Sequence, residues 1–400
     1  MNVYPRHRLD LAGGDVLTGL RATLRAPDPA ALEAAVLQAA GMTDRGLACL
    51  SVRSAWDLLL EVLAWPTGSE VIVSAITHPD MITIVHAHGL RAVPVDLDLA
   101  TLAPRVEDLE RACTARTRAV MIVHLFGGRI DLRPVADFAR RHDLLLIEDS
   151  AQAFTGTDSL AASGADVSMF SFGMIKTASA VGGALVSVGD AELLSSMRKE
   201  QDSWPAQHRV GYALKLAKAG GLAAVFNDPR RFRALYRLCR RLGLDLDSMI
   251  NTSTRSFAAG EALWARIRRR PAPALLAVLC RRLGRVDQAR LARRATMGEE
   301  LRAGLPAGYL HPGDELLRRT HWLFPVLAPD PIALVAALRQ AGIDVSAGTS
   351  NLIAVPADDG SVPECAGRLM SSIVYLPSYP ELGEEGRDRL LAGLRVACPS

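Results

Sequence analysis

The stretch LLLIEDSAQAF (residues 144–154) opens with an apolar run and then places Glu148 and Asp149 side by side. The stretch SMFSFGMIKTASAVGGALV (168–186) has the same order, because a second apolar run is followed by Lys176 and then by two adjacent glycines. Short, continuous apolar runs are typical of strands that are buried on both faces of a parallel sheet. Ligands bind such sheets beyond the carboxyl ends of the strands. We therefore expect Asp149 and Lys176 to serve one binding site.

Apolar runs and helical segments alternate on both sides of these stretches. The predicted strands span residues 70–74, 92–95, 119–123, 144–147, 167–172 and 184–188. The predicted helices span residues 30–40, 55–63, 81–88, 106–112 and 133–141. This alternation favours an α/β fold with a mostly parallel central sheet that is covered by helices.

A second, smaller α/β pattern follows residue 300. Its predicted strands and helices are 321–327, 332–341, 372–376 and 384–396. We expect a large domain over residues 20–250 and a small C-terminal α/β domain over residues 296–400, which residues 1–19 could join.

Composition excludes several other classes of protein. A chain of 400 residues with 49% hydrophobic content can bury a large core, and its net charge of +3 points to no nucleic-acid partner. The six cysteines are scattered without CxxC pairs, which favours reduced thiols and no metal site. The N-terminus lacks the apolar core of a secretion signal, and no apolar run reaches the ~18 residues that a membrane span needs. We therefore expect a cytoplasmic, enzyme-sized protein.

Residues 207–295 differ from the rest of the chain in charge. Between Arg209 and Arg294 there are twenty Lys and Arg against five Asp and Glu. We interpret this segment as a divergent helical insertion and leave three roles open. Its arginine stems could cover apolar surface, its charge could bind an anionic substrate such as a nucleotide diphosphate or a lipid phosphate, or it could contact a membrane surface. No recognition motif supports nucleic-acid binding.

Asp149 and Lys176 together are what chemistry with pyridoxal 5'-phosphate (PLP) requires. A lysine amine condenses with the aldehyde of PLP, and a buried aspartate keeps the pyridine nitrogen protonated, so that the ring accepts electrons from the substrate. Either residue alone would more often be structural. Their combination with the two glycines and the α/β pattern favours a PLP enzyme.

The two stretches resemble the DegT/StrS-type sugar aminotransferase family, which has the aspartate-aminotransferase-like fold type I. The family's E-D-x-A-Q and S-F-x-x-x-K motifs are matched by Glu148, Asp149, Ala151, Gln152, Ser171, Phe172 and Lys176. The resemblance covers roughly residues 45–200 and, more thinly, residues 320–395.

The resemblance implies a role for each of four residues. Lys176 would hold PLP as a Schiff base and would move the proton between the substrate carbon and C4' of the cofactor. Asp149 would pair with the pyridinium nitrogen. Gln152 would lie beside the phenolic oxygen, and Ser171 would donate to the phosphate.

Two further segments match the family less closely. SVRSAWDLLLEVL (51–63) resembles the family's S-G-T-x-A-L turn, which binds the cofactor phosphate at a helix N-terminus. Because Val52 and Arg53 replace the usual Gly and Thr, the phosphate contact would fall to Ser54 and backbone amides, with Arg53 adding a charge-assisted bond. His78 stands where the family has an aromatic residue that stacks on the cofactor ring.

Two family features are altered in this chain. Val181 replaces the acidic residue that precedes the family's double glycine. The family's N-Y-R-M segment, whose Asn reaches the phosphate of the neighbouring subunit, is hard to find, and Asn251 and Arg255 are the nearest candidates.

The resemblance implies a homodimer that works as an aminotransferase in two half-reactions. An amino donor, Glu or Gln in the family, would leave its amino group on the cofactor, and a keto-sugar or similar carbonyl acceptor would take it. A sugar dehydratase is one alternative, but such enzymes have His in place of Lys176. A PLP-binding regulator or scaffold without catalysis is another, kept open by the altered inter-subunit segment.

Overall fold

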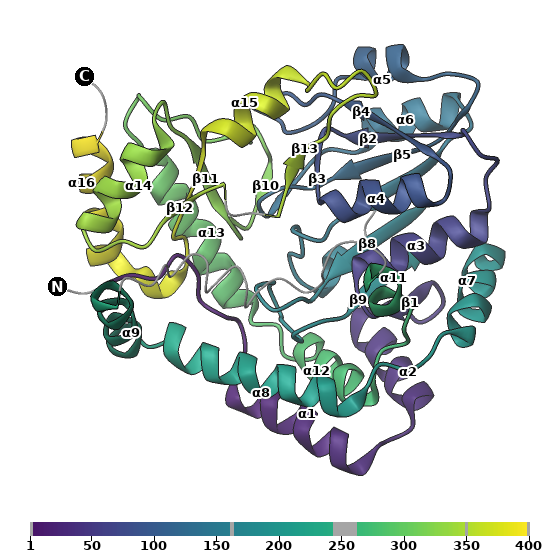
Figure 1. The fold of residues 1–400 in the computed structure, drawn as a ribbon, viewed down its shortest axis with the longest axis horizontal. Helices are drawn as coiled ribbons and strands as arrows, with labels where there is room; N and C mark the ends of the chain where they lie inside the picture. The colour runs from purple at the N-terminus through teal and green to yellow at the C-terminus, as the bar shows by residue number, and fades with distance from the viewer. Residues whose placement is uncertain (1–2, 161–163, 243–261, 349–350, 398–400) are drawn as a thin grey trace.

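The computed structural model describes residues 3–160, 164–242, 262–348 and 351–397 (Figure 1). A seven-stranded sheet lies in it with the strand order β1-β9-β8-β7-β5-β2-β4. The strands are β1 (Gly46–Cys49), β2 (Glu70–Ser74), β4 (Arg91–Val95), β5 (Thr117–Val123), β7 (Leu145–Asp149), β8 (Val167–Ser171) and β9 (Ala184–Val188). The neighbours from β8 to β4 run parallel, and β9 is antiparallel to both β8 and β1. The predicted α/β class with a mostly parallel sheet is confirmed.

Side chains of the sheet alternate between two hydrophobic clusters. In β8, Val167 and Met169 belong to the first cluster, whereas Phe170 belongs to the second. This alternation is the period of two of a β-strand, so the two clusters lie on opposite faces of the sheet. The described helices that contribute to the first cluster are α3 (Val52–Leu63), α4 (Pro79–Ala87), α5 (Val106–Ala112), α6 (Arg133–Arg141), α7 (Ala191–Ser203), α11 (Ala262–Ile267) and α15 (Glu364–Ser372). Those of the second are α1 (Gly13–Arg25), α2 (Pro29–Ala40), α8 (Arg209–Phe226) and α12 (Pro273–Leu283).

Capping residues set where two helices begin. Helix α3 begins at Val52, three residues before the predicted start, because the Ser51 hydroxyl accepts the N–H of Ser54 at 3.1 Å. Helix α4 begins at Pro79, whose missing N–H is tolerated in the first turn, and the His78 ring nitrogen Nδ1 accepts the N–H of Asp80 at 3.1 Å.

A third hydrophobic cluster is built from Tyr4 and from residues between Met297 and Leu394. Its strands, β11 (Phe324–Leu327), β14 (Ile373–Leu376) and β12 (Ser346–Ala347), form an antiparallel sheet in that order. Its helices are α13 (Gln288–Ala303), α14 (Pro331–Gln340) and α16 (Gly383–Ala397). The N-terminal segment reaches this cluster, because the buried guanidinium of Arg6 donates to Asp344 at 2.6 Å.

The basic segment is helical, as predicted, but it is more than a solvated surface layer. Helices α8, α9 (Pro229–Arg241), α11 (Ala262–Ile267), α12 and the first half of α13 occupy its described part. Leu275 and Leu279 of α12 are fully buried against the sheet in the second cluster. The candidates Asn251 and Arg255 lie outside the described residues.

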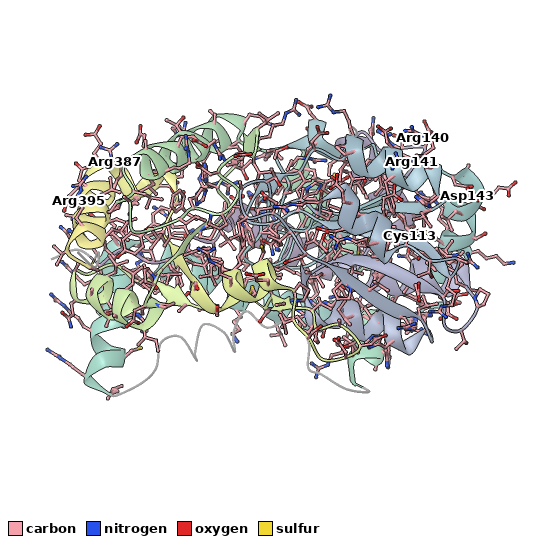
Figure 2. All side chains as sticks on the ribbon, turned by 90° about the horizontal axis from the view of Figure 1, so that it is seen from above. Cys113, Arg140, Arg141, Asp143, Arg387 and Arg395 are labelled. Carbon is pink, nitrogen blue, oxygen red and sulfur yellow. The ribbon has the colours of Figure 1, made fainter. Side chains whose placement is uncertain are left out.

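Surface charges outside this segment are largely matched in pairs. Figure 2 shows Arg387 of α16 at one end of the molecule and Arg141 of α6 at the other. Arg387 pairs with Glu300 at 2.6 Å, and Arg141 pairs with Glu110 at 2.7 Å. Such exposed pairs contribute little to stability. No helix among the described residues combines the length and the apolar character that crossing a bilayer requires.

Candidate active site

A cavity of about 1020 Å³ lies beyond the carboxyl ends of the parallel strands. Six of the seven predicted site residues line it, namely Arg53, His78, Asp149, Gln152, Ser171 and Lys176. Residues of α8 and α11, the N-terminal residue His7, and Trp322 and Tyr375 from the C-terminal part complete the wall. The structure therefore brings residues from the stretches 144–154 and 168–186 into one site.

A tight loop returns Lys176 to the cavity after β8 ends. The carbonyl of Phe172 accepts the N–H groups of Ala180 and Gly182 at 2.9 and 3.2 Å, which closes residues 172–183 into the Lys176 loop. Glycine suits the place where this loop meets α12, because Gly183 has a positive φ of 88° and a Cβ on Gly182 or Gly183 would stand 3.1 Å from the side chain of Leu275, closer than an ordinary contact. The double glycine thus has a packing reason.

Burial shifts the pKa values of the two central groups toward their neutral forms. It lowers the pKa of Lys176 to about 7, with Asp149 opposing and Arg53 adding to the shift. It raises the pKa of Asp149, although the N–H of Ala151, which donates at 2.9 Å, and Lys176 both favour the carboxylate. An amine with a pKa near 7 is partly neutral at physiological pH, which both nucleophilic attack and proton transfer require.

Trp322 covers the amine of Lys176. The Lys176 Nζ lies 4.0 Å from the centroid of the Trp322 ring, and the indole N–H donates to the carbonyl of Ile175 at 3.0 Å. Arg294 holds the two segments together, because its guanidinium donates to the carbonyl of Thr320 at 2.8 Å and to the hydroxyl of Thr177 at 3.2 Å. The cation–π contact favours the charged amine and opposes the effect of burial.

Gln152 and Thr77 present hydrogen-bonding groups to the cavity. The Gln152 side-chain oxygen accepts the N–H of Phe126 at 2.9 Å, which leaves both Nε2 donors for a ligand oxygen. The Thr77 hydroxyl is buried and has no partner among the residues that the structure describes. A buried hydroxyl without a partner at the wall of a cavity fits a ligand with hydrogen-bonding groups.

Behind Asp149, Glu148 fixes the end of β7. It is fully buried and accepts hydrogen bonds from Arg129 at 2.5 Å, Ser150 at 2.9 Å and Ser168 at 2.8 Å. His124 Nδ1 accepts the N–H of Ile130 at 3.0 Å, so its Nε2 carries the proton and donates to Glu148 at 2.7 Å. His124 is therefore a buried structural residue that holds Glu148 in place.

At the N-terminus of α3 the cavity is lined by Ser51, Val52 and Arg53, not by Ser54. Because the helix begins three residues early, Ser54 turns into the core, where its hydroxyl lies 2.9 Å from that of Ser51 and is fully buried. The prediction that Ser54 contacts a phosphate is not supported by this placement, and Ser51 takes its position at the wall.

Arg53 and His78 both form hydrogen bonds with Asp80. The Arg53 guanidinium donates to Asp80 Oδ2 at 2.7 Å. Burial, with the charge of Arg53, lowers the pKa of His78 to about 4, so the ring is a neutral, flat imidazole at physiological pH. This is compatible with stacking on an aromatic ligand.

The basic segment forms one wall of the site. His208, Tyr212 and Lys215 of α8 and its N-cap line the cavity together with Arg266 and Arg269 near α11. The Tyr212 hydroxyl donates to the carbonyl of Ala180 in the Lys176 loop at 2.7 Å. Among the lining residues, Asp149 is the single carboxylate against five Lys and Arg. The cavity is therefore suited to anions.

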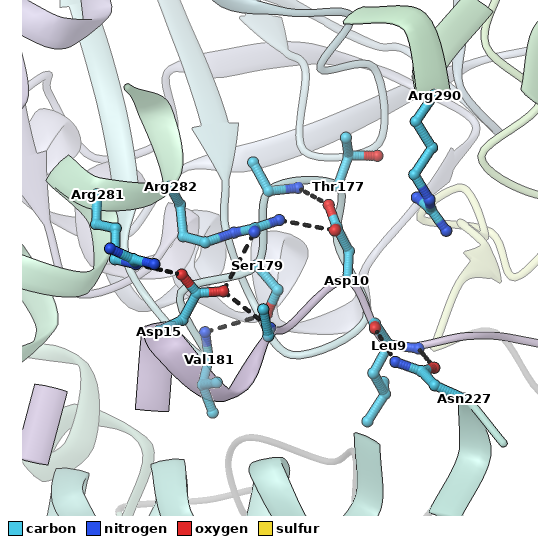
Figure 3. A network of polar contacts seen from close by, with 12 residues as sticks. Leu9, Asp10, Asp15, Thr177, Ser179, Val181, Asn227, Arg281, Arg282 and Arg290 are labelled. Carbon is cyan, nitrogen blue, oxygen red and sulfur yellow. Dashed lines mark hydrogen bonds and ion pairs between the residues drawn. The ribbon is translucent and has the colours of Figure 1, made fainter. Parts of the chain in front are cut away.

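The N-terminal segment contacts the Lys176 loop through Asp10 (Figure 3). Asp10 accepts the N–H of Ala178 at 2.7 Å and pairs with Arg282 at 2.7 Å. Asp15, which is buried, pairs with Arg281 at 2.9 Å and Arg282 at 3.2 Å. The Asp10 contact, with the N–H of Val181 that donates to the Ser179 hydroxyl at 3.1 Å, supports a loop in which Ala178 and Val181 have positive φ angles of 54° and 59°.

A model of the DegT/DnrJ/EryC1/StrS aminotransferase family matches residues 15–217 of the chain. The chain belongs to this family. The resemblance that the two motifs suggested is thereby confirmed, and residues of both motifs, among them Asp149, Gln152, Ser171 and Lys176, line the cavity.

Two relatives and one solved structure illustrate the likeness. The chain is 33% identical over 231 residues to the UDP-N-acetyl-3-dehydro-alpha-D-glucosamine 3-aminotransferase of Acidithiobacillus ferrooxidans, which covers 54% of this chain and 62% of the relative. It is 36% identical over 154 residues to the GDP-perosamine synthase of Caulobacter vibrioides, which covers 38% and 42%. The chain thus spans less than two thirds of the length of these relatives. The structure of NtdA from Bacillus subtilis with bound cofactor PMP has a TM-score of 0.69 at 18% identity and covers 96% of this chain and 81% of that one, which shows the shared fold type I.

The residues of this family member fit PLP. Aminotransferases of the family depend on PLP. Lys176 and Asp149 supply the amine and the carboxylate, Gln152 and Thr77 offer donors, and the N-terminus of α3 offers backbone N–H groups beside Ser171. These groups match, in their chemistry, the aldehyde, the ring nitrogen, the phenolic oxygen and the phosphate of PLP.

The wall residues that sequence reasoning missed include His7, Thr77, Lys215 and Trp322. They come from the N-terminus, β3 (Ile76–Thr77), α8 and the segment before β11, and none belongs to a motif. Only the excess of basic residues in 207–295 hinted at Lys215.

Proposed function

We propose that the protein is a PLP-dependent aminotransferase that carries its cofactor on Lys176. The proposal rests on one observation above all: Lys176 and Asp149 share a cavity whose other charged residues are cationic. Bound PLP would supply an electron-accepting ring for the carbon that loses and gains the amino group. Asp149 would hold the ring nitrogen, Gln152 the phenolic oxygen, Ser171 and the α3 N-terminus the phosphate, and His78 the ring face.

Lys176 would also move the proton of the transferred group. Its lowered pKa, about 7, gives a neutral amine that accepts a proton and a charged amine that returns it near the same pH. The Trp322 ring, whose centroid lies 4.0 Å from Lys176 Nζ, would stabilise the charged lysine amine through a cation–π contact.

A nucleotide-linked keto-sugar is the acceptor that we propose. The two relatives are named for UDP- and GDP-linked sugars. Arg266 and Arg269 at the wall, from the basic segment, suit the diphosphate of such a compound. Glu or Gln is the proposed amino donor, and the working unit is proposed to be a homodimer in the cytoplasm.

Two other proposals for the chain receive less support. A dehydratase of this family type would have His in place of Lys176, and a non-catalytic scaffold would not need the lysine and aspartate together. Contact of the basic segment with a membrane surface stays a prediction. The exposed apolar side chains of Leu214 in α8 and Leu238 in α9 are compatible with it.

An absorbance experiment tests the proposal. Purified protein is mixed with PLP and then with L-glutamate or L-glutamine, beside Lys176→Ala and beside Lys199→Ala, an exposed lysine of α7. The wild type and Lys199→Ala should show the visible band of a lysine-bound PLP, and the donor should move it to shorter wavelength. Lys176→Ala should lack the stable band. A band that no amino donor moves would exclude transamination.

A further inference from the structure

The cavity has a corner where three structural elements meet. The N–H of Gly183 donates to the carbonyl of Leu50 at 2.9 Å, which places the double glycine beside the N-terminus of α3. Ser171 pairs with Ala184 across β8 and β9, directly after the glycines. Ser51, Ser171 and Gly183 all line the cavity, so hydroxyl groups and helix N–H groups converge here. We call this region the α3 corner.

Lys215 of α8 reaches the α3 corner from the basic segment. Its Nζ stands 4.0 Å from the point where a Cβ on Gly182 would lie. Tyr212, three residues earlier on the same face of α8, holds the helix in place through its bond to Ala180. The hydrogen bond of Tyr212 therefore fixes the position of the helix backbone that carries the Lys215 ammonium.

The charge at this corner is unbalanced. Burial and the charge of Arg53 both lower the pKa of Lys215. The second effect means that the two cations are close enough to repel each other. Arg53 is paired with Asp80 at 2.7 Å, whereas Lys215 forms no ion pair with any residue that the structure describes. A half-buried ammonium without a counter-ion, facing a helix N-terminus, is stabilised by a bound anion.

We propose that Lys215, together with Arg53, binds the phosphate of the cofactor, an inference that rests on the proposed PLP function. Helix α8 of the basic segment then becomes part of the cofactor site. The chain carries its own phosphate-binding cations here, whatever a neighbouring subunit adds.

The test compares PLP with pyridoxal, which has the same aldehyde and ring but no phosphate. Dissociation constants for both are measured from the absorbance of the lysine-bound form in the wild type, Lys215→Ala and Lys215→Met. Lys218→Ala is the matched control, because Lys218 is exposed on the same helix and does not line the cavity. Unchanged thermal unfolding of the variants without cofactor shows that α8 is intact.

Both Lys215 variants should bind PLP roughly tenfold or more weakly, the usual effect of losing a charge-assisted bond, while their affinity for pyridoxal stays the same. Inorganic phosphate should compete with PLP in the wild type and less in the variants. A PLP-to-pyridoxal affinity ratio equal to that of the wild type and of Lys218→Ala would overturn the proposal. If neither aldehyde binds covalently to the wild type, the proposed function itself falls.

Discussion

At the scale of the residue, Lys176 experiences two opposing effects. Burial favours its neutral form and lowers its pKa to about 7, whereas the face of Trp322, 4.0 Å away, favours the ammonium. Trp322→Leu should therefore lower the pKa of Lys176 further, by about half a unit to one unit, and Trp322→Phe should restore much of it. The pH dependence of the rate at which the cofactor-free protein condenses with pyridoxal measures this pKa. A pKa that rises in Trp322→Leu would contradict the assignment.

The same lysine makes the stability of the cofactor-free protein depend on pH. Its pKa falls from 10.5 to about 7 on folding, so between these values the unfolded chain binds more protons and stability rises with pH. Lys176→Met should flatten this rise and should be more stable at pH 7 by on the order of 1 kcal/mol or more. Urea denaturation across pH 6–10 (roughly the window of the shift) measures it. Lys199→Met, on the surface, should keep the dependence of the wild type.

At the scale of the element, the N-terminus of α3 combines a stabilising cap with a proposed binding role. Ser51→Ala should cost about 1 kcal/mol of stability, because the N–H of Ser54 loses its acceptor, and it should also weaken PLP binding. Asp28→Ala is the matched control, since Asp28 caps α2 through the N–H groups of Ala30 and Ala31 and does not line the cavity. It should lose similar stability with PLP affinity intact. If both variants bound PLP with equal affinity, Ser51 would have no role in binding the cofactor.

Elements with strong local patterns could be predicted from the sequence. The strand at 70–74 was placed without error because EVIVS is continuously apolar and β-branched. The starts of α3 and α4 were missed because their caps, Ser51 and His78, were read as turn and site residues. The short strand β1 (Gly46–Cys49) was missed because GLAC has no strong strand propensity and is stabilised by pairing with β9.

The site was predictable only as far as its motifs extend. Asp149, Gln152, Ser171 and Lys176 follow strand ends, and parallel strands bring their carboxyl ends to one edge. Lys215 and Trp322 reach the same cavity through the packing of α8 and of the segment before β11, which no local pattern encodes.

At the scale of the whole molecule, the N-terminal segment joins the third hydrophobic cluster to the Lys176 loop. Arg6 binds Asp344, and Asp10 binds Ala178. Arg6→Met should destabilise the protein by about 3–5 kcal/mol, because it leaves the buried Asp344 without its cation, and adding Asp344→Leu should recover much of the loss. Denaturant unfolding of both single variants and the double variant tests this. A double variant no more stable than Arg6→Met would contradict it. The division into domains at 20–250 and 296–400 stays a prediction.

The central claim for the molecule is that Lys176 holds PLP covalently. Borohydride reduction of the protein with PLP, followed by proteolysis and mass spectrometry, tests it most directly, since reduction fixes a Schiff base as a stable amine. We predict a single major phosphopyridoxyl label, on Lys176, that disappears in Lys176→Ala. A label on another lysine, or no label at all, would contradict the claim.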